Sequence, residues 1–165
     1  MNQETLSLVI SITGAIVSIA TFSIAYSQMK IASAKTKLDL YNKRFNIYAA
    51  ALDYYQATWY ESPEKIQEKS IIFTKLYRES QFLFEESDGV YATLGKIQQN
   101  GAQIYAYEKK KHEIDPNLTK TWNSLDEMHR ISTAARFSFE ENLKALEKQL
   151  DKYLQFKTIS GWKLF

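Results

Sequence analysis

The sequence predicts an all-α protein, in which an N-terminal transmembrane helix continues into an antiparallel four-helix cytosolic bundle. Three observations predict this class. An uncharged stretch, Thr5–Met29, lies near the N-terminus. Beyond it, apolar residues recur at alternating steps of three and four, the spacing of a helix face. Only five Gly and two Pro occur in 165 residues, so long uninterrupted helices are favoured over strands.

The apolar stretch Thr5–Met29 is long enough, at 1.5 Å per residue, to cross a hydrocarbon layer of about 30 Å. A membrane interior satisfies no free backbone group, so the stretch is expected to cross as one helix. Only Glu4 precedes it, whereas basic residues follow at Lys30, Lys35, Lys37, Lys43 and Arg44. The excess of basic residues after the stretch places the N-terminus outside and the rest of the chain in the cytoplasm.

A cleaved signal peptide is the competing interpretation, because Ala32-Ser33-Ala34 resembles a cleavage site. Three features oppose it. No Lys or Arg precedes the apolar stretch, the stretch exceeds the usual ~7–15 residues, and Lys30 stands before the supposed site. The sequence therefore favours a retained anchor over residues 1–30, a helical bundle over 31–156 and a C-terminal tail over 157–165.

Small residues inside the apolar stretch follow steps of 4, 3, 4, 3 and 4, and so share one helix face: Ser7, Ser11, Gly14, Ser18, Thr21 and Ala25. We call them the small-residue face. Small side chains let helices approach closely in lipid, and Ser and Thr add hydrogen bonds between helices. The face is therefore predicted to associate with a second copy or with a partner's transmembrane helix. The alternative is that the hydroxyls bond to carbonyls of their own helix.

The segment from Lys30 to Tyr60 contains no helix breaker and is predicted to continue the first helix, to a total length on the order of 80 Å. It carries an apolar stripe sustained over about four heptads. The stripe comprises Ile31, Ala34, Leu38, Tyr41, Phe45, Tyr48, Leu52, Tyr55 and Trp59. Further apolar residues widen it, namely Leu40, Ile47, Ala51 and Tyr54, as expected of a bundle helix that buries a broad face.

Residues 35–48, KTKLDLYNKRFNIY, resemble the juxtamembrane stretch of small bacterial single-pass inner-membrane proteins of unassigned function. Their pattern is K-L-x-L-F/Y-D/N-K-R-F/Y, and Asn42 stands where Asp is commoner. The resemblance implies a bacterial inner (plasma) membrane location and a helical cytosolic part. Lys43 and Arg44 are candidates for a juxtamembrane interaction. The alternative is a solvated face in which Arg44 pairs with a carboxylate such as Asp39 or a Glu of a neighbouring helix.

Three further helices follow. Ser62-Pro63-Glu64 is a helix start, and its helix is expected to reach about Glu86. The next begins near Asp88 and runs to about Lys111, with Gly101 marking either a kink or the close approach of a neighbouring helix. Asp115-Pro116 starts the last, expected to reach about Phe156. Short connections favour antiparallel packing. The tail Lys157–Phe165 is expected to fold back or to dock on a partner.

No catalytic, cofactor-binding or metal site is predicted. The chain has no cysteine and contains none of the common nucleotide-binding, hydrolase or metalloprotease motifs. Asp126 and His129 form half of a bundle metal motif, which would need a second such pair. The net charge of +2 indicates no nucleic-acid partner. An enzyme is therefore not expected, and the half-motif is interpreted as ordinary helix surface.

The sequence favours a non-enzymatic, membrane-anchored helical-bundle protein that acts as an assembly, sensing or scaffold subunit at the cytosolic face. The expected partners are the lipid bilayer and either a second copy or another membrane protein. The alternative is a membrane-disrupting, pore-forming effector of a bacterial defence or toxin system. In that case hydroxyl residues of the apolar stretch would line the opening: Ser7, Ser11, Thr13, Ser18, Thr21 and Ser23.

Overall fold

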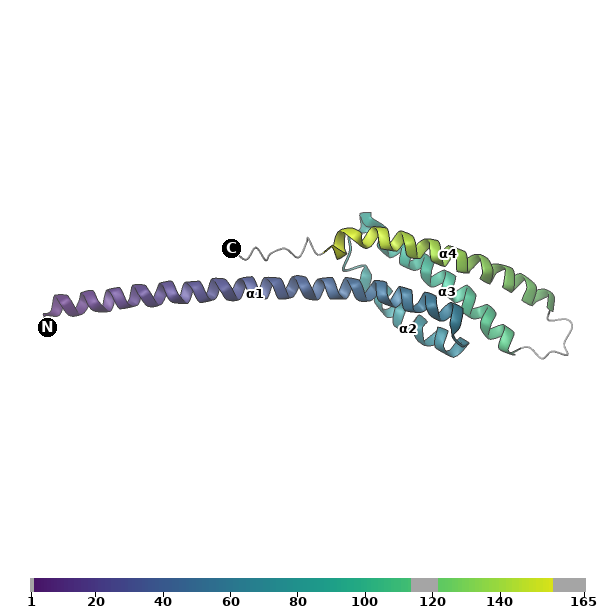
Figure 1. Cartoon of the computed structure of the whole chain (residues 1–165), viewed down its shortest axis with the longest axis horizontal. Coiled ribbons are helices and arrows are strands. Elements are labelled where there is room, and N and C mark those ends of the chain that lie inside the picture. The colour runs from purple at the N-terminus through teal and green to yellow at the C-terminus, as the bar shows by residue number, and fades with distance from the viewer. Residues whose placement is uncertain (1, 114–121, 156–165) are drawn as a thin grey trace. The chain divides into compact units, whose positions relative to one another are not determined.

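The computed structural model describes residues 2–113 and 122–155. Within these residues all regular structure is helical (Figure 1): α1 (Gln3–Tyr60), α2 (Pro63–Ser80), the short 3₁₀ helix η1 (Glu86–Asp88), α3 (Val90–Glu113) and α4 (Trp122–Leu154). The predicted all-α class is thus confirmed for the described residues. The chain divides into two compact units, whose described parts are residues 2–39 and residues 40–113 with 122–155.

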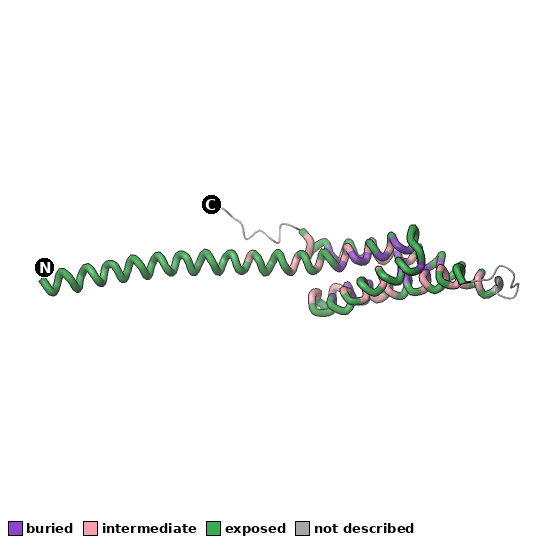
Figure 2. Tube along the Cα trace, turned by 90° about the horizontal axis from the view of Figure 1, so that it is seen from below, coloured by how far each residue is buried: buried purple, intermediate pink, exposed green. Residues whose placement is uncertain are grey.

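Helix α1 is continuous from Gln3 to Tyr60, as the absence of helix breakers predicts. In the first unit every residue from 2 to 33 is exposed, including all the large apolar side chains (Figure 2). Ile19, for example, is 69% exposed and Phe22 is 73% exposed. The first unit therefore consists of a helix whose apolar surface is covered by no described residue of the chain.

The second unit contains the hydrophobic core, to which all four α-helices contribute. Helices α3 and α4 bury residues at steps of three and four, the spacing predicted from the sequence for a helix face. Helix α3 buries Val90, Leu94, Ile97, Gly101 and Ile104, and α4 buries Ser132, Ala135, Phe139, Leu143, Leu146 and Leu150. Tyr54 of α1 lies at the centre, with its ring 5.5 Å from the rings of both Phe73 of α2 and Phe139 of α4.

The face that α1 buries differs from the centre of the predicted apolar stripe. The buried side chains are Ile47, Ala50, Ala51, Tyr54, Ala57 and Thr58, whereas Phe45 and Trp59 of the stripe are 44% and 45% exposed. The residues expected only to widen the stripe therefore form its buried centre. The small Ala side chains at 50, 51 and 57 leave room beside α1 for side chains of the neighbouring helices, which a line of large side chains would fill.

Helix α2 ends at Ser80, so the expectation that it reaches about Glu86 is wrong. The hydroxyl of Ser80 donates to the carbonyl of Tyr77 at 2.6 Å, and the chain then turns before η1. The carbonyl of Leu83 accepts two hydrogen bonds from Arg44, which lies 39 residues earlier in the chain. That long-range contact favours a turn where local sequence alone favours helix.

Gly101 leaves room for the Tyr54 ring of α1 and does not interrupt α3, which is continuous from Val90 to Glu113. A Cβ atom at this position would lie 2.2 Å from Cζ of Tyr54. The predicted start of the last helix at Asp115-Pro116 and the tail Lys157–Phe165 lie outside the described residues.

Candidate functional site

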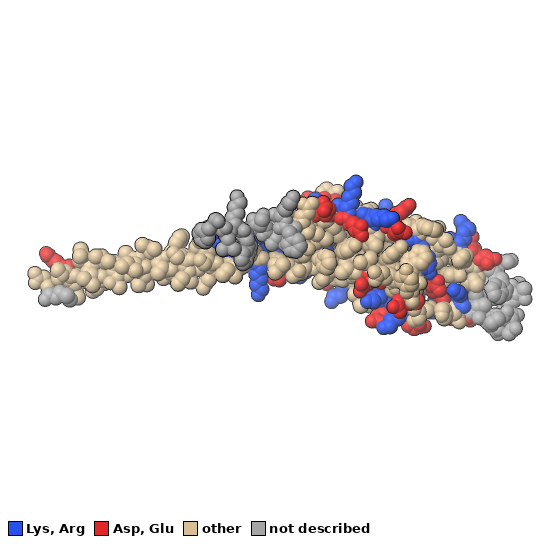
Figure 3. Space-filling view, viewed as in Figure 1, with Lys and Arg blue, Asp and Glu red and all other residues tan. Residues whose placement is uncertain are grey.

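The apolar stretch Thr5–Met29 is the first candidate site. Among the described helices, α1 alone is long and apolar enough to span a membrane, judged by length and composition. None of the stretch is buried inside the protein. In the face drawn in Figure 3, acidic and basic side chains gather over the second unit, whereas residues 5–29 contain none. The chemistry of this stretch suits a lipid environment or a partner helix.

All six residues of the small-residue face are exposed on α1. Three of their hydroxyls donate within the helix: Ser11 to the carbonyl of Ser7 at 2.9 Å, Ser18 to that of Gly14 at 2.8 Å, and Thr21 to that of Val17 at 2.8 Å. No heavy atom of another segment lies within 4 Å of a Cβ built on Gly14. The small side chains would therefore let another helix come close, whereas three of the hydroxyls are already bonded within α1. The role of the face in association stays a prediction.

Lys43 and Arg44, the predicted juxtamembrane pair, have different surroundings. Lys43 is exposed, whereas Arg44 is half-buried in the second unit. The Nε and Nη2 atoms of Arg44 donate to the carbonyl of Leu83 at 3.1 and 3.0 Å. Its guanidinium lies 4.2 Å from the ring centre of Tyr153. The hydrogen-bond acceptor is a backbone carbonyl instead of the carboxylate that the sequence suggested.

Burial lowers the pKa of Arg44, and the nearby Tyr153 and Glu85 partly oppose this effect. Arginine stays protonated in proteins, so the group remains a cation that is held by a carbonyl and an aromatic ring. The contact joins α1 to the turn after α2 and to the end of α4. Arg44 therefore stabilises the second unit.

Replacing Arg44 with Met is expected to lower the free energy of unfolding by about 2 kcal/mol, because hydrogen bonds from a charged group are lost and a carbonyl is left without its donor. Urea titration of the full chain in detergent, followed by circular dichroism, measures the change. Lys43→Met is the matched control and should leave the unfolding midpoint nearly unchanged. Equal effects of the two variants would contradict this account of Arg44.

Arg44 and its partners are a first polar cluster. The second is centred on Asp88 of η1, which lies beside Tyr153. Lys152 donates to its carboxylate at 2.5 Å, and the Tyr153 hydroxyl donates to the other carboxylate oxygen. The next residue, Gly89, has φ of 68°, a conformation that favours glycine and that starts α3. The Asp88 side chain is only 13% exposed. The cluster therefore fixes the turn between α2 and α3 against the end of α4.

The hydrogen bonds from Lys152 and Tyr153 lower the pKa of Asp88. The unfolded chain thus binds the proton more tightly than the folded chain. The resulting stabilisation is complete above the ordinary pKa near 3.9, and it is lost as the pH falls through the lower folded-state value. We expect Asp88→Asn to flatten the loss of stability below about pH 4, measured as urea midpoints from pH 7 to pH 2. A wild-type pH profile retained by the variant would contradict this expectation.

The third polar cluster lies around Arg136 of α4. Its Nη2 atom donates to Glu108 of α3 at 2.7 Å, and its Nη1 atom donates to the carbonyl of Thr58 near the end of α1. The guanidinium also lies 4.9 Å from the ring centre of Trp59. Both side chains of the ion pair are largely buried, at 14% and 18% exposed. One arginine thereby links α1, α3 and α4.

The half-motif of Asp126 and His129 lies on the exposed surface of α4. The ring of exposed His129 lies 5.2 Å from that of Tyr107. Within residues 2–113 and 122–155, no group of three or more His, Cys, Asp or Glu is placed to hold a metal ion. Comparison with protein-family models, with curated proteins and with solved structures gives no match.

Proposed function

We propose that this protein is a non-enzymatic subunit that is anchored in the bacterial inner membrane by one helix and that assembles, senses or serves as a scaffold at the cytosolic face. The observation that carries the proposal is the composition of α1. One continuous helix contains an uncharged apolar stretch that is wholly exposed and, nearer its end, the residues Ile47–Thr58 that supply part of a packed core. Exposed apolar surface of this extent is stable in lipid and costly in water.

The orientation follows from charge. Glu4 alone precedes the apolar stretch, and Lys30, Lys35 and Lys37 follow it closely. Because basic residues are retained in the cytoplasm, we assign the N-terminus to the outside and the second unit to the cytoplasm. The bacterial location rests on the resemblance of residues 35–48 to juxtamembrane segments of small inner-membrane proteins.

We further propose that the second unit is an antiparallel four-helix bundle. Helices adjacent in sequence contact one another. Tyr54 of α1 packs on Phe73 of α2, Tyr77 of α2 stacks on Tyr91 of α3 at 4.6 Å, and Arg136 of α4 pairs with Glu108 of α3. Helix α4 also contacts α1, because the Tyr48 hydroxyl donates to Glu147 at 2.8 Å. Such contacts between neighbours, with a closing contact between first and last, are those of an up-down bundle.

The charged clusters support a structural role for the second unit. Arg44, Asp88 and Arg136 each join different segments of the chain. One described depression gathers Glu64, Lys109, His112 and Glu113, but no Ser, Thr or Cys lines it as a nucleophile would. Assembly or sensing requires a folded unit and an exposed surface, and the packed core of the second unit and the exposed apolar stretch support this proposal.

Membrane fractionation and topology mapping test the proposal. The full-length chain should remain in the membrane pellet after alkaline carbonate extraction. In the cysteine-free background, Asn2→Cys should react with an impermeant maleimide in intact spheroplasts, and Glu61→Cys should react only after lysis. Full-length chain in the soluble fraction, a mature N-terminus near Lys35, or the reverse labelling pattern would overturn the proposal.

A membrane-disrupting effector is the second candidate, because six Ser and Thr residues of the apolar stretch would be available to an oligomeric opening. Ser11, Thr13, Ser18 and Thr21 already donate to carbonyls of α1, which lowers their value as pore-lining donors. Membrane potential during induced expression separates the two functions. A collapse of the potential favours the effector, and an unchanged potential favours the anchored scaffold.

A further inference from the structure

We infer that α1 pairs in parallel with α1 of a second copy of this chain, along a line of large apolar residues placed at every seventh position. This inference rests on the proposed function, whose assembly step it specifies. The line, which we call the seam, comprises Ile10, Val17, Ile24, Ile31, Leu38, Phe45, Leu52 and Trp59. It passes without a break in period from the apolar stretch into the charged part of α1.

The period identifies the kind of partner. A repeat of seven over many turns keeps one line of side chains facing a neighbouring helix when both helices wind into a left-handed supercoil. Inside the apolar stretch large apolar residues are common everywhere, so the informative positions lie beyond Lys30. All four seam residues there, from Ile31 to Leu52, and then Trp59, are large and apolar, although this segment also carries many charged residues.

Each unit, taken by itself, leaves the seam residues other than Leu52 at least 44% exposed. In the first unit Ile10, Val17 and Ile24 are 64%, 58% and 59% exposed, and Ile31 and Leu38 are 69% and 47% exposed. In the second unit the core takes Ile47, Ala51 and Tyr54 instead of the seam, and Phe45 and Trp59 remain 44% and 45% exposed. Only Leu52 is half-buried.

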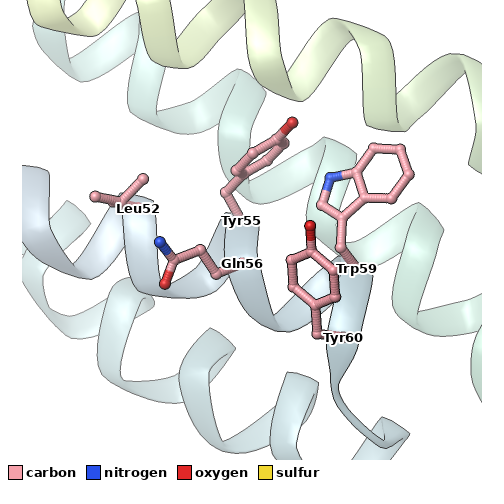
Figure 4. A pocket seen from close by; sticks show the side chains of 5 residues that line it. All are labelled: Leu52, Tyr55, Gln56, Trp59 and Tyr60. Atoms are coloured by element: carbon pink, nitrogen blue, oxygen red, sulfur yellow. The ribbon is translucent and has the colours of Figure 1, made fainter.

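The surface of the second unit between Leu52 and Trp59 is hollowed. A shallow depression of about 410 Å³ is lined by Leu52, Tyr55, Gln56, Trp59 and Tyr60, all of them from α1 (Figure 4). In paired helices, a seam side chain of one helix fits between four side chains of the other. Four of the residues that line the hollow, Leu52, Tyr55, Gln56 and Trp59, have the spacing of such a hole, and two of them belong to the seam.

The area available matches what a specific pair needs. An aromatic side chain presents ~150–250 Å² in all, so half-exposed Phe45 and Trp59 offer roughly 100 Å² each, and Ile31 and Leu38 offer similar areas. A pair of chains would then cover on the order of 800–1,000 Å² outside the apolar stretch, close to the lower bound of ~1,000 Å² for specific interfaces. The seam positions within the apolar stretch add further area.

A second copy of this chain, inserted in the same membrane, has the parallel orientation that the pairing requires. Copies inserted with the same topology are parallel and share one plane, so residue 31 meets residue 31 of the partner. Like charges oppose the pairing, since in a parallel supercoil Lys30 would face Lys35 of the other chain. Added salt should therefore strengthen the pairing by screening this repulsion.

The seam and the small-residue face are centred on different sides of α1, although Gly14 and Thr21, four positions after Ile10 and Val17, lie only about 40° from the seam. Ser11, Ser18 and Ala25 each follow a seam residue by one position, which places them about 100° away around the helix. Extended beyond Lys30, the small-residue face would continue at Ala32, Asp39 and Asn46. These positions give a matched alternative against which the seam is tested.

Disulfide scanning tests the inference in the full chain, which has no native cysteine. Ile31→Cys, Leu38→Cys and Phe45→Cys are compared with Ala32→Cys, Asp39→Cys and Asn46→Cys after mild copper-catalysed oxidation in lipid vesicles. Because a disulfide requires closely spaced Cα atoms, seam positions should form at least about fivefold more covalent dimer. In the Ile31→Cys background, Leu38→Lys should abolish cross-linking while helix content stays unchanged.

Three outcomes would overturn the seam. Maxima at 32, 39 and 46 would assign the interface to the small-residue face and leave the proposed function intact. Membrane-bound chain with no cross-linking at any position would remove self-association but retain the anchor. An adduct whose mass is not twice that of the chain would identify a different partner. Failure of the proposed function is recognised separately, as full-length chain that does not sediment with the vesicles.

Discussion

Gly101→Ala is expected to lower the free energy of unfolding of the second unit by about 3 kcal/mol, although alanine is the better helix former. The added Cβ would lie 2.2 Å from both Cζ and the hydroxyl oxygen of Tyr54. The Tyr54 ring cannot move away easily, because it is fully buried between Phe73 and Phe139. Helices α1 and α3 must therefore separate, and contacts along both helices are lost. Urea titration of the full chain in detergent measures the effect.

Gly95→Ala is the matched control in the same helix. Its Cβ would meet the Tyr77 side chain, with the hydroxyl oxygen at 3.2 Å and Cζ at 3.7 Å, so a small shift of Tyr77 is enough. Replacing an interior helix glycine gains up to ~1 kcal/mol in helix propensity, so Gly95→Ala should be neutral or stabilising. Adding Tyr54→Leu to Gly101→Ala should recover part of the loss, since the clash is removed. A Gly101→Ala variant as stable as Gly95→Ala would show that the Tyr54 ring does not lie against Gly101.

Gly101 shows which features of the fold could be predicted from the sequence and which could not. Its position on the buried stripe of α3 could be predicted, because Val90, Leu94, Ile97 and Ile104 follow a strong helical period. Whether it marks a kink or a close approach could not be decided, since the answer depends on a tyrosine 47 positions earlier in the chain. The stripes of α3 and α4 were predictable for the same reason of strong periodicity.

The buried face of α1 was harder to predict than those of α3 and α4. The large residues of the apolar stripe give the stronger periodic signal, yet the core uses Ile47, Ala51 and Tyr54. Small alanines are weak signals in a hydrophobic pattern, although they decide how closely helices pack. The signal that could have identified this face is the group of alanines at 50, 51 and 57.

Some candidate site residues could be predicted from the sequence, and others could not because their contacts depend on distant segments. The apolar stretch could be recognised from composition alone, because its chemistry depends on no other segment. The surroundings of Arg44 could not be predicted, because its acceptor is the backbone carbonyl of Leu83, and a carbonyl is present at every residue. The cluster around Arg136 was missed altogether for a related reason. An ion pair between α3 and α4 becomes visible only when the register of the two helices is known.

The second large effect is expected for Arg136→Met, which should lower the free energy of unfolding by about 3 kcal/mol. Most of the lost stability comes from the groups that the variant leaves without their partner. Glu108 keeps a carboxylate that is 18% exposed and has lost its cation. The carbonyl of Thr58, one of the last in α1, loses the donor that satisfies it. Trp59 also loses the cation over its ring. Met conserves most of the aliphatic volume, so the change isolates the polar contacts.

Two further variants separate the ion pair from general damage to α4. Arg130 pairs with Glu127 on the same helix, but both side chains are largely exposed, at 74% and 55%. Arg130→Met should therefore leave the unfolding midpoint nearly unchanged. Glu108→Gln combined with Arg136→Met should be more stable than Arg136→Met alone, because the uncompensated charge is removed. If the double variant is the less stable of the two, the cost lies in the Thr58 and Trp59 contacts, and Glu108 contributes little to holding α3 against α4.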